Sequence, residues 1–213
     1  MLDAMNTARA EILDRIRKVN AGAGAQERGI AYQGIERGYQ QAAEVSGTVL
    51  AELFADRLRE YDAQVYETTG ADVRDAIAKA LAGHGQKSAV VAVALPEHWI
   101  PAGLSWRTEV DASTDAMSRA AGAIASCEVA IAHTGTIVVR GSRRLTLLPD
   151  RLLCVVREEQ IVETVPEAFA RLQPFAKDAL TFISGPSATA DIEMTRIRGV
   201  HGPRFLDVVL VRG

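Results

Sequence analysis

Hydroxyl-bearing residues gather in two short stretches that interrupt apolar runs. The first stretch is Thr134-Gly135-Thr136, and the second, Ser184-Gly185-Pro186-Ser187, follows the apolar run Leu180–Ile183. Two hydroxyls beside a flexible glycine can hold a carboxylate or a phosphate through short hydrogen bonds. The first stretch is equally typical of a β-bulge whose threonines serve only the sheet. We expect the two bends to converge at one rim of a sheet and to form a shared pocket.

The second stretch leads into a predicted short polar helix over residues 189–193, in which Ser187 or Thr189 serves as the cap. Unpaired amide groups and the helix dipole both attract anions to such a helix start. Asp191 and Glu193 can themselves satisfy that dipole, so a capped connecting helix is the alternative interpretation. Residues 199–203 and a last strand over residues 205–211 follow.

Arginine and histidine residues flank both stretches. Arg140, Arg143 and Arg144 could clamp an anion, because a guanidinium fork matches carboxylate and phosphate geometry, or they could form a solvated hairpin tip. Arg204 is a separate candidate for the same task. The remaining residues of this kind, His133 and His201, suit general acid–base chemistry or a structural hydrogen-bonding role.

No catalytic residue is assigned, because the familiar signatures of nucleophiles, nucleotide-binding loops and histidine metal sites are missing from the sequence. Two cysteines, Cys127 and Cys154, cannot build an iron–sulfur cluster or a zinc site by themselves. We therefore expect no cofactor and no metal in this chain. The candidate ligand-binding residues are Thr134, Gly135, Thr136, Ser184, Gly185, Pro186, Ser187, Thr189, Asp191, His201, Gly202 and Arg204, with His133, Arg143 and Arg144 as further candidates.

Composition limits the classes of partner. The 213 residues carry a net charge of −3, with 48% hydrophobic and 24% charged residues, which gives no overall electrostatic case for nucleic-acid binding. No apolar run approaches the roughly 20 residues that cross a bilayer. The acidic, amphipathic start is unlike a signal peptide, so we expect a cytoplasmic protein without a membrane span.

The spacing of apolar residues predicts two parts. Residues 1–45 should form a helix over residues 3–20 and an irregular, glycine-rich segment over residues 21–41. From residue 46 to 213, helices at residues 48–60, 71–82 and 115–126 alternate with apolar strands. This alternation predicts an α/β fold with a largely parallel sheet. The strand at residues 88–94 has no polar alternation, which is typical of a central strand covered on both faces.

Five motifs in a fixed order resemble the LUD domain, and within it the lactate-utilisation protein C (LutC, YkgG-like) group. The resemblance covers about residues 45–213. The motifs are Ala130-Ile-Ala-His-Thr-Gly-Thr-Ile-Val-Val139, Leu145-Thr-Leu-Leu-Pro149, Ile183-Ser-Gly-Pro-Ser187, Thr189-Ala-Asp-Ile-Glu193 and Gly199-Val-His-Gly-Pro203. The family usually has an acidic residue where this chain has His133.

The resemblance implies a NagB/RpiA/CoA-transferase-like fold, a Rossmann-like sheet with helices on both faces. The N-terminal helical arm is expected from the spacing of apolar residues alone. The resemblance also implies a component of a system that oxidises L-lactate to pyruvate. LutA/LutB-like iron–sulfur proteins would be its partners and would carry the clusters, while this chain binds a small anionic ligand or a partner. The alternative, by analogy of fold alone, is a stand-alone enzyme acting on a sugar phosphate, an acyl-CoA or a folate.

Overall fold

A computed structural model describes residues 2–21, 24–40, 42–85, 87–120, 122–190, 196–199 and 201–213. The chain divides into two units, residues 1–39 and residues 40–213. The first unit holds α1 (Leu2–Asn20) and α2 (Ala25–Gln33). The predicted irregular segment is therefore wrong over α2, where Gly29 is tolerated inside a helix. No described helix is long and apolar enough to cross a bilayer.

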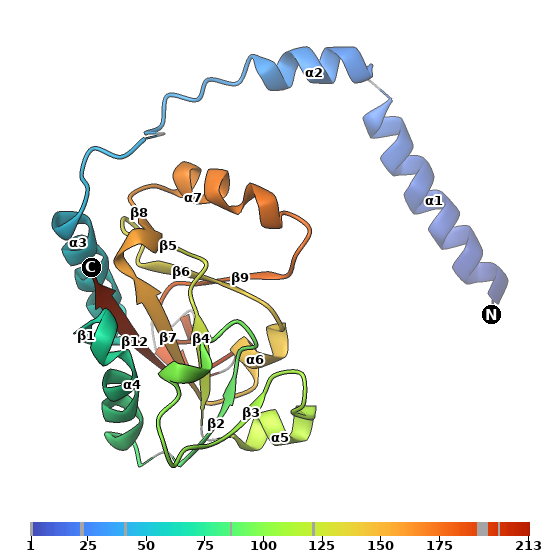
Figure 1. Ribbon diagram of the computed structural model, residues 1–213. Helices are drawn as coiled ribbons and strands as arrows, with labels where there is room; N and C mark the ends of the chain where they lie inside the picture. Colours follow the sequence, from blue (N-terminus) through green and yellow to red (C-terminus); the bar gives the residue numbers. More distant parts are fainter. Residues whose placement is uncertain are drawn as a thin grey trace. The chain divides into compact units, whose positions relative to one another are not determined.

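The second unit is built on a six-stranded sheet in the order β1-β12-β7-β4-β2-β3, in which every neighbouring pair is parallel (Figure 1). Its strands are β1 (Gln64–Thr69), β2 (Ser88–Val91), β3 (Ser105–Thr108), β4 (Ala123–Ser126), β7 (Arg151–Arg157) and β12 (Phe205–Arg212). Short 3-10 helices lie at Gly70–Asp72, Glu97–Trp99, Glu158–Gln160 and Gln173–Phe175. The predicted α/β class is confirmed.

Helices cover both faces of this sheet. Along β7, Leu152, Cys154 and Val156 join one buried cluster, whereas Leu153 and Val155 join another. The first cluster contains the apolar sides of α3 (Thr48–Glu60), α5 (Thr114–Arg119) and α6 (Arg143–Leu147), and the second contains that of α4 (Val73–Ala82). Burial on both faces explains why the central strands are continuously apolar.

A second, mixed sheet packs against the first cluster. Its order is β8-β5-β6-β9, from β8 (Ile161–Val162), β5 (Val129–Ile131), β6 (Thr136–Arg140) and β9 (Leu180–Ile183). Its other face is covered by α7 (Val165–Leu172), through a third buried cluster that includes Ala168 and Leu172. The sequence indicated the bend at residues 134–136 between apolar runs, but not the existence of a separate sheet.

Two predicted helices are wrong in part. Residues 115–126 form α5 and then the buried strand β4, because the last four residues lie in the middle of the parallel sheet. Residues 188–190 form β10 (Ala188–Ala190), which pairs with β11 (Arg196–Arg198), so no helix opens at Thr189. Asp191 and Glu193 lie outside the described residues.

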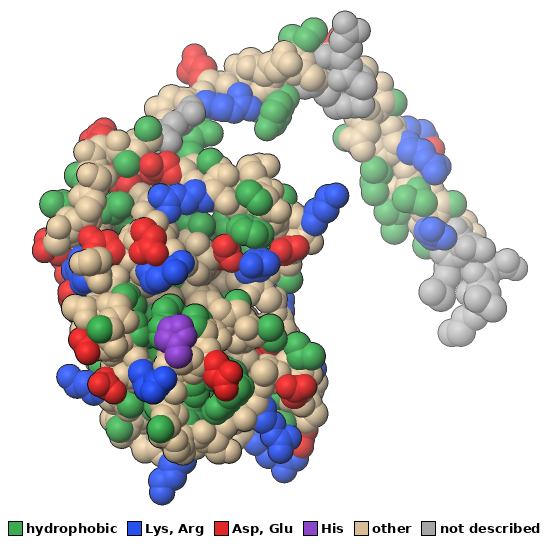
Figure 2. All heavy atoms as spheres, in the orientation of Figure 1, with side chains coloured by type: hydrophobic (Ala, Val, Ile, Leu, Met, Phe, Trp, Pro, Cys, Tyr) green, Lys and Arg blue, Asp and Glu red, His purple; other side chains and the backbone are tan. Residues whose placement is uncertain are grey.

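Acidic and basic side chains are interspersed over the face of the molecule drawn in Figure 2. This distribution agrees with the net charge of −3 and shows no basic field on that face. Strong binding to nucleic acid depends on such a field. The picture therefore gives no support for a nucleic-acid partner on this face.

Candidate functional site

The two glycine-containing bends meet at one end of the second sheet. Strands β6 and β9 are antiparallel neighbours, with Ile137 opposite Ile183, so the residues before β6 and after β9 lie side by side. The Thr136 hydroxyl lies 2.7 Å from that of Ser184 and forms a second hydrogen bond, of 2.6 Å, with the hydroxyl of Thr134. The prediction that the bends converge is confirmed.

One end of α3 supports both bends. Gly135 has a φ of +57°, and a Cβ atom placed there would lie 3.0 Å from the Cβ of Arg57. Gly185 has a φ of +82°, and its Cβ would lie 2.6 Å from the Cβ of Tyr61. Both positions thus need glycine for two reasons, the backbone conformation and the close approach of α3.

A hollow of about 260 Å³ opens beside the second bend. Residues 181–188 and 201–203 line it, together with Thr146, Leu147, Leu152 and Leu206. Ser187 holds its two sides together, because its hydroxyl accepts a hydrogen bond of 3.2 Å from the backbone amide of His201. Four hydroxyl-bearing residues, Thr146, Thr181, Ser184 and Ser187, therefore line a partly apolar cavity of a size that suits a small ligand.

The first bend is not part of that lining. Thr136 is only 6% exposed, and its hydroxyl is held between Thr134 and Ser184. The expectation of a pocket shared by both bends is therefore wrong. Instead, the first bend stabilises Ser184 from behind, while residues 201–203 supply the opposite wall.

An adjoining hollow of about 910 Å³ shares Leu147, His201 and Gly202 with the first, and brings in Arg143 and Arg204. Arg204 is committed to Asp150, through hydrogen bonds of 2.5 and 2.7 Å that raise the pKa of the guanidinium. Arg143 makes no ion pair with any described residue. Arg143 is therefore the cation available to an anionic ligand in this hollow.

Arg140 and Arg144 are engaged elsewhere. Arg140 pairs with Glu128 at 2.9 Å and with Asp178 at 3.4 Å, and its guanidinium lies 4.5 Å above the ring of Phe175. Arg144 donates a hydrogen bond of 3.3 Å to the Thr114 hydroxyl. The structure thus separates the three arginines that the sequence suggested as one clamp.

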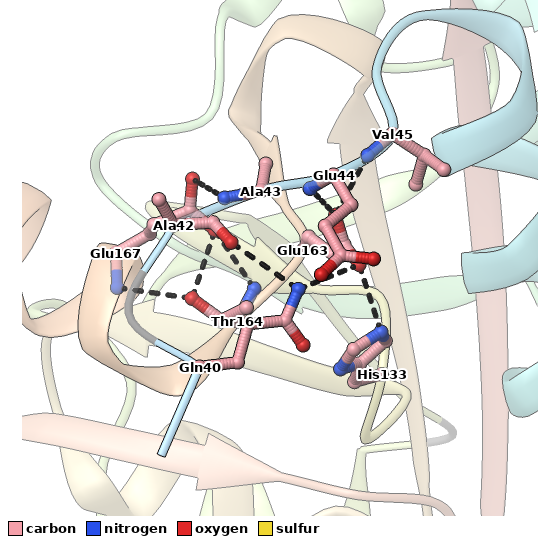
Figure 3. A network of polar contacts seen from close by, with 9 residues as sticks. All are labelled: Gln40, Ala42, Ala43, Glu44, Val45, His133, Glu163, Thr164 and Glu167. Carbon is pink, nitrogen blue, oxygen red and sulfur yellow. Dashed lines mark hydrogen bonds and ion pairs between the residues drawn. The ribbon is translucent and has the colours of Figure 1, made fainter. Parts of the chain in front are cut away.

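His133 belongs to a polar network centred on Glu163 (Figure 3). Its Nε2 lies 3.0 Å from the carboxylate of Glu163, whose side chain is 5% exposed. That carboxylate also accepts hydrogen bonds from the backbone amides of Glu44 (2.6 Å) and Val45 (2.9 Å) and from the side chain of Gln40 (3.3 Å). We call residues 40–45 the strap, of which Gln41 is not described.

These bonds favour the ionised carboxylate. The amide of Val45 contributes most to a lowered pKa of Glu163, and burial acts in the opposite direction. Glu167, four residues further along, accepts a 3.2 Å bond from the amide of Ala43 and also caps α7 through Thr164. Sequence reasoning missed Glu163, although the pattern Thr164-x-x-Glu167 marks a helix start directly after it.

Comparison with known proteins identifies the family. Residues 50–211 match the LUD domain. The chain belongs to the LUD domain family. Lactate utilization protein C of Deinococcus radiodurans is 39% identical over 181 residues, which is 81% of this chain and 84% of that protein. The protein of the same name from Bacillus subtilis is 30% identical over 119 residues, about half of each chain.

A solved structure shows the same fold. The crystal structure of a DUF162 family protein from Deinococcus radiodurans matches this LUD domain with a TM-score of 0.67 and 34% sequence identity. The match covers 78% of this chain and 99% of that one. The predicted recognition of the LUD family, and the fold class that it implied, are both confirmed.

The remaining candidates of the LUD domain are placed less favourably. Thr189 lies in β10, and Asp191 is outside the described residues. Among the described residues, no group of three histidine, cysteine or acidic side chains could hold a metal ion. Cys127 and Cys154 are both buried, and burial raises the pKa of the Cys154 thiol to about 12.

Proposed function

We propose that this chain is a LutC-like component of an L-lactate utilisation system. The relative from Deinococcus radiodurans carries the proposal, because its name is lactate utilization protein C and the similarity spans more than four-fifths of each chain. The agreement in fold with a solved family member adds support. We expect the chain to support growth on lactate as a subunit of this system, without a cofactor of its own.

The geometry favours a small anionic ligand in the joined hollows. Hydroxyls of Thr181, Ser184 and Ser187 provide hydrogen bonds, and Arg143 supplies a positive charge at the adjoining hollow. LutA/LutB-like proteins with iron–sulfur clusters are the proposed partners that oxidise lactate. A chain whose two cysteines are both buried suits this division of labour.

Growth on L-lactate tests the proposal. Deletion of the gene should abolish or slow growth on L-lactate as sole carbon source and leave growth on pyruvate unchanged. Affinity purification from lactate-grown cells should recover iron–sulfur proteins. Unchanged growth on lactate after deletion, together with no such partners, would reject the proposed function.

Complementation tests whether the second bend matters. Gly185→Val should fail to restore lactate growth, because a Cβ atom would collide with Tyr61. Gly185→Ala and Gly103→Ala form the matched pair, because the two φ angles, +82° and +81°, are nearly the same and only at Gly185 does an added Cβ meet another residue. Equal growth with both variants would show that the contact between this bend and α3 is dispensable.

A further inference from the structure

A separate cavity of about 770 Å³ lies at the amino-terminal ends of three parallel strands. Gln64, Arg151 and Phe205, the first residues of β1, β7 and β12, all line it. Apart from Leu206, it shares no lining residue with the hydroxyl-lined hollow. None of the residues that the sequence suggested as ligand-binding contributes to it.

The cavity contains a buried carboxylate that is only half satisfied. Asp207 is 1% exposed, and its Oδ2 accepts a hydrogen bond of 2.7 Å from Nη1 of Arg151. Its other oxygen, Oδ1, has no hydrogen-bond partner among the described residues. Buried polar atoms are nearly always paired, because an unmade hydrogen bond leaves the cost of desolvation without compensation.

His84 stands next to the unpaired oxygen without closing the contact. It follows the end of α4, its side chain is 28% exposed, and its Nε2 lies 3.6 Å from Oδ1 of Asp207. That separation is too long for a direct hydrogen bond. A ligand hydroxyl that contacts both groups can donate its hydrogen to Oδ1 and exchange a hydrogen bond with the imidazole.

Arg151 supplies the complementary donor. Its guanidinium is held 4.4 Å above the ring of Phe205, and one nitrogen is engaged with Asp207. No other hydrogen bond or ion pair joins Arg151 to the described residues. The remaining N–H groups of a guanidinium match the two oxygens of a carboxylate.

We propose that this cavity binds a small 2-hydroxy carboxylate, with its carboxylate on Arg151 and its hydroxyl between Asp207 and His84. The inference rests on the proposed function, because L-lactate is the simplest 2-hydroxy acid that a lactate-utilisation component would meet. It assigns a ligand class to residues that lie outside the joined hollows. The step is one of binding, and no bond of the ligand is broken.

Titration of the full-length chain with L-lactate and with propionate, followed by NMR or calorimetry, tests the assignment. Propionate differs from lactate only by lacking the 2-hydroxyl, so L-lactate should bind roughly tenfold more tightly. His84→Gln should remove most of that advantage and leave propionate binding unchanged. His98→Gln is the matched control, because this exposed histidine lines neither this cavity nor the joined hollows, and it should change neither affinity.

Three results would overturn the assignment: no L-lactate binding, equal affinity for propionate, or lactate binding that Arg143→Gln weakens and His84→Gln does not. His84 is partly exposed, so the His84→Gln variant keeps the buried pair of Asp207 and Arg151 and should still fold. A negative result in these binding experiments would not affect the proposed function, which the growth experiment tests separately. Conversely, intact lactate binding with unchanged growth after deletion would reject the function alone.

Discussion

Two buried carboxylates, Glu163 and Asp207, have opposite surroundings. Glu163 contacts two backbone amides, the Gln40 side chain and His133. Asp207 has one hydrogen-bond partner, Arg151, and its other oxygen has only the imidazole of His84 nearby, 3.6 Å away. The fully paired carboxylate of Glu163 holds the strap in place, whereas the half-paired carboxylate of Asp207 can still accept a hydrogen bond from a ligand. This difference distinguishes a structural carboxylate from a ligand-binding one.

The reason for the difference lies in the position of each residue. Glu163 follows the short strand β8 and faces the strap. The backbone N–H groups of Glu44 and Val45 in the strap have no partner in a sheet, so they can donate hydrogen bonds to the Glu163 carboxylate. Asp207 lies inside β12, between β1 and β7. Backbone amides of paired strands are consumed by the sheet, so only side chains or a ligand can satisfy Asp207.

Removal of the Asp207 carboxylate should have the largest effect. Asp207→Ala leaves the buried Arg151 guanidinium without its counter-charge, and we expect it to lower the free energy of unfolding by about 3–5 kcal/mol. Urea denaturation of the variant and the parent chain measures the loss. Arg59→Gln, which removes two exposed ion pairs at the same cavity, with Asp56 and with Glu67, should cost at most about 1 kcal/mol. Similar losses of unfolding free energy in both variants would show that Arg151 does not depend on Asp207 for its counter-charge.

Glu163→Gln should have a smaller effect, confined to the strap. Both strap amides donate to one oxygen, Oε2, and a glutamine carbonyl there can still accept both, but the bonds lose the assistance of the negative charge. The NH2 group of the glutamine would take the place of Oε1, the acceptor that faces Gln40 and His133. Hydrogen exchange at these two amides should become faster, with a smaller loss of global stability than for Asp207→Ala. Unchanged exchange in the strap would show that Glu163 does not hold it.

The sequence allowed part of this architecture to be predicted. The apolar runs around residues 135 and 186 were long enough to indicate strands, and the polar bends between them indicated where those strands turn. Strand β4 was missed, because Ala123-Ile-Ala-Ser126 is short and alanine favours helices. Its burial in the sheet centre decided its conformation instead.

The two carboxylates could not be predicted in the same way. Glu163 meets donors 118 and 119 residues away, and Asp207 meets Arg151 from 56 residues away. No local spacing encodes such pairs, since they arise only when distant strands and loops have been placed by the hydrophobic core. Sequence patterns therefore found the bends, whereas the buried acids required coordinates.

At low pH, the parent chain should lose the extra folding stability that Glu163 gives it over the Glu163→Gln variant. The folded state lowers the pKa of Glu163, so its contribution to stability is fully present above the pKa of a free glutamate, about 4.3. The contribution is lost as the pH falls through the lower pKa of the folded state. The difference in unfolding midpoint between the parent chain and Glu163→Gln should thus shrink below pH 4. A difference independent of pH would contradict an ionised Glu163.

The smallest expected effect concerns Cys154, which is buried beside Asp207. Burial, and secondarily the charge of Asp207, raise the pKa of this thiol to about 12. In the folded chain at pH 8 it should not react with an alkylating reagent, and it should react once the chain is unfolded in urea. Rapid modification of the folded protein would show that water reaches this side of Asp207.

A crystal structure of the full chain grown with L-lactate is the decisive experiment for the Asp207 site. The lactate carboxylate should lie against Arg151 and its hydroxyl within hydrogen-bonding distance of Oδ1 of Asp207, with Glu163 and the strap unchanged. Lactate in the joined hollows beside Arg143, with only water at Asp207, would show that the site has been assigned to the wrong cavity.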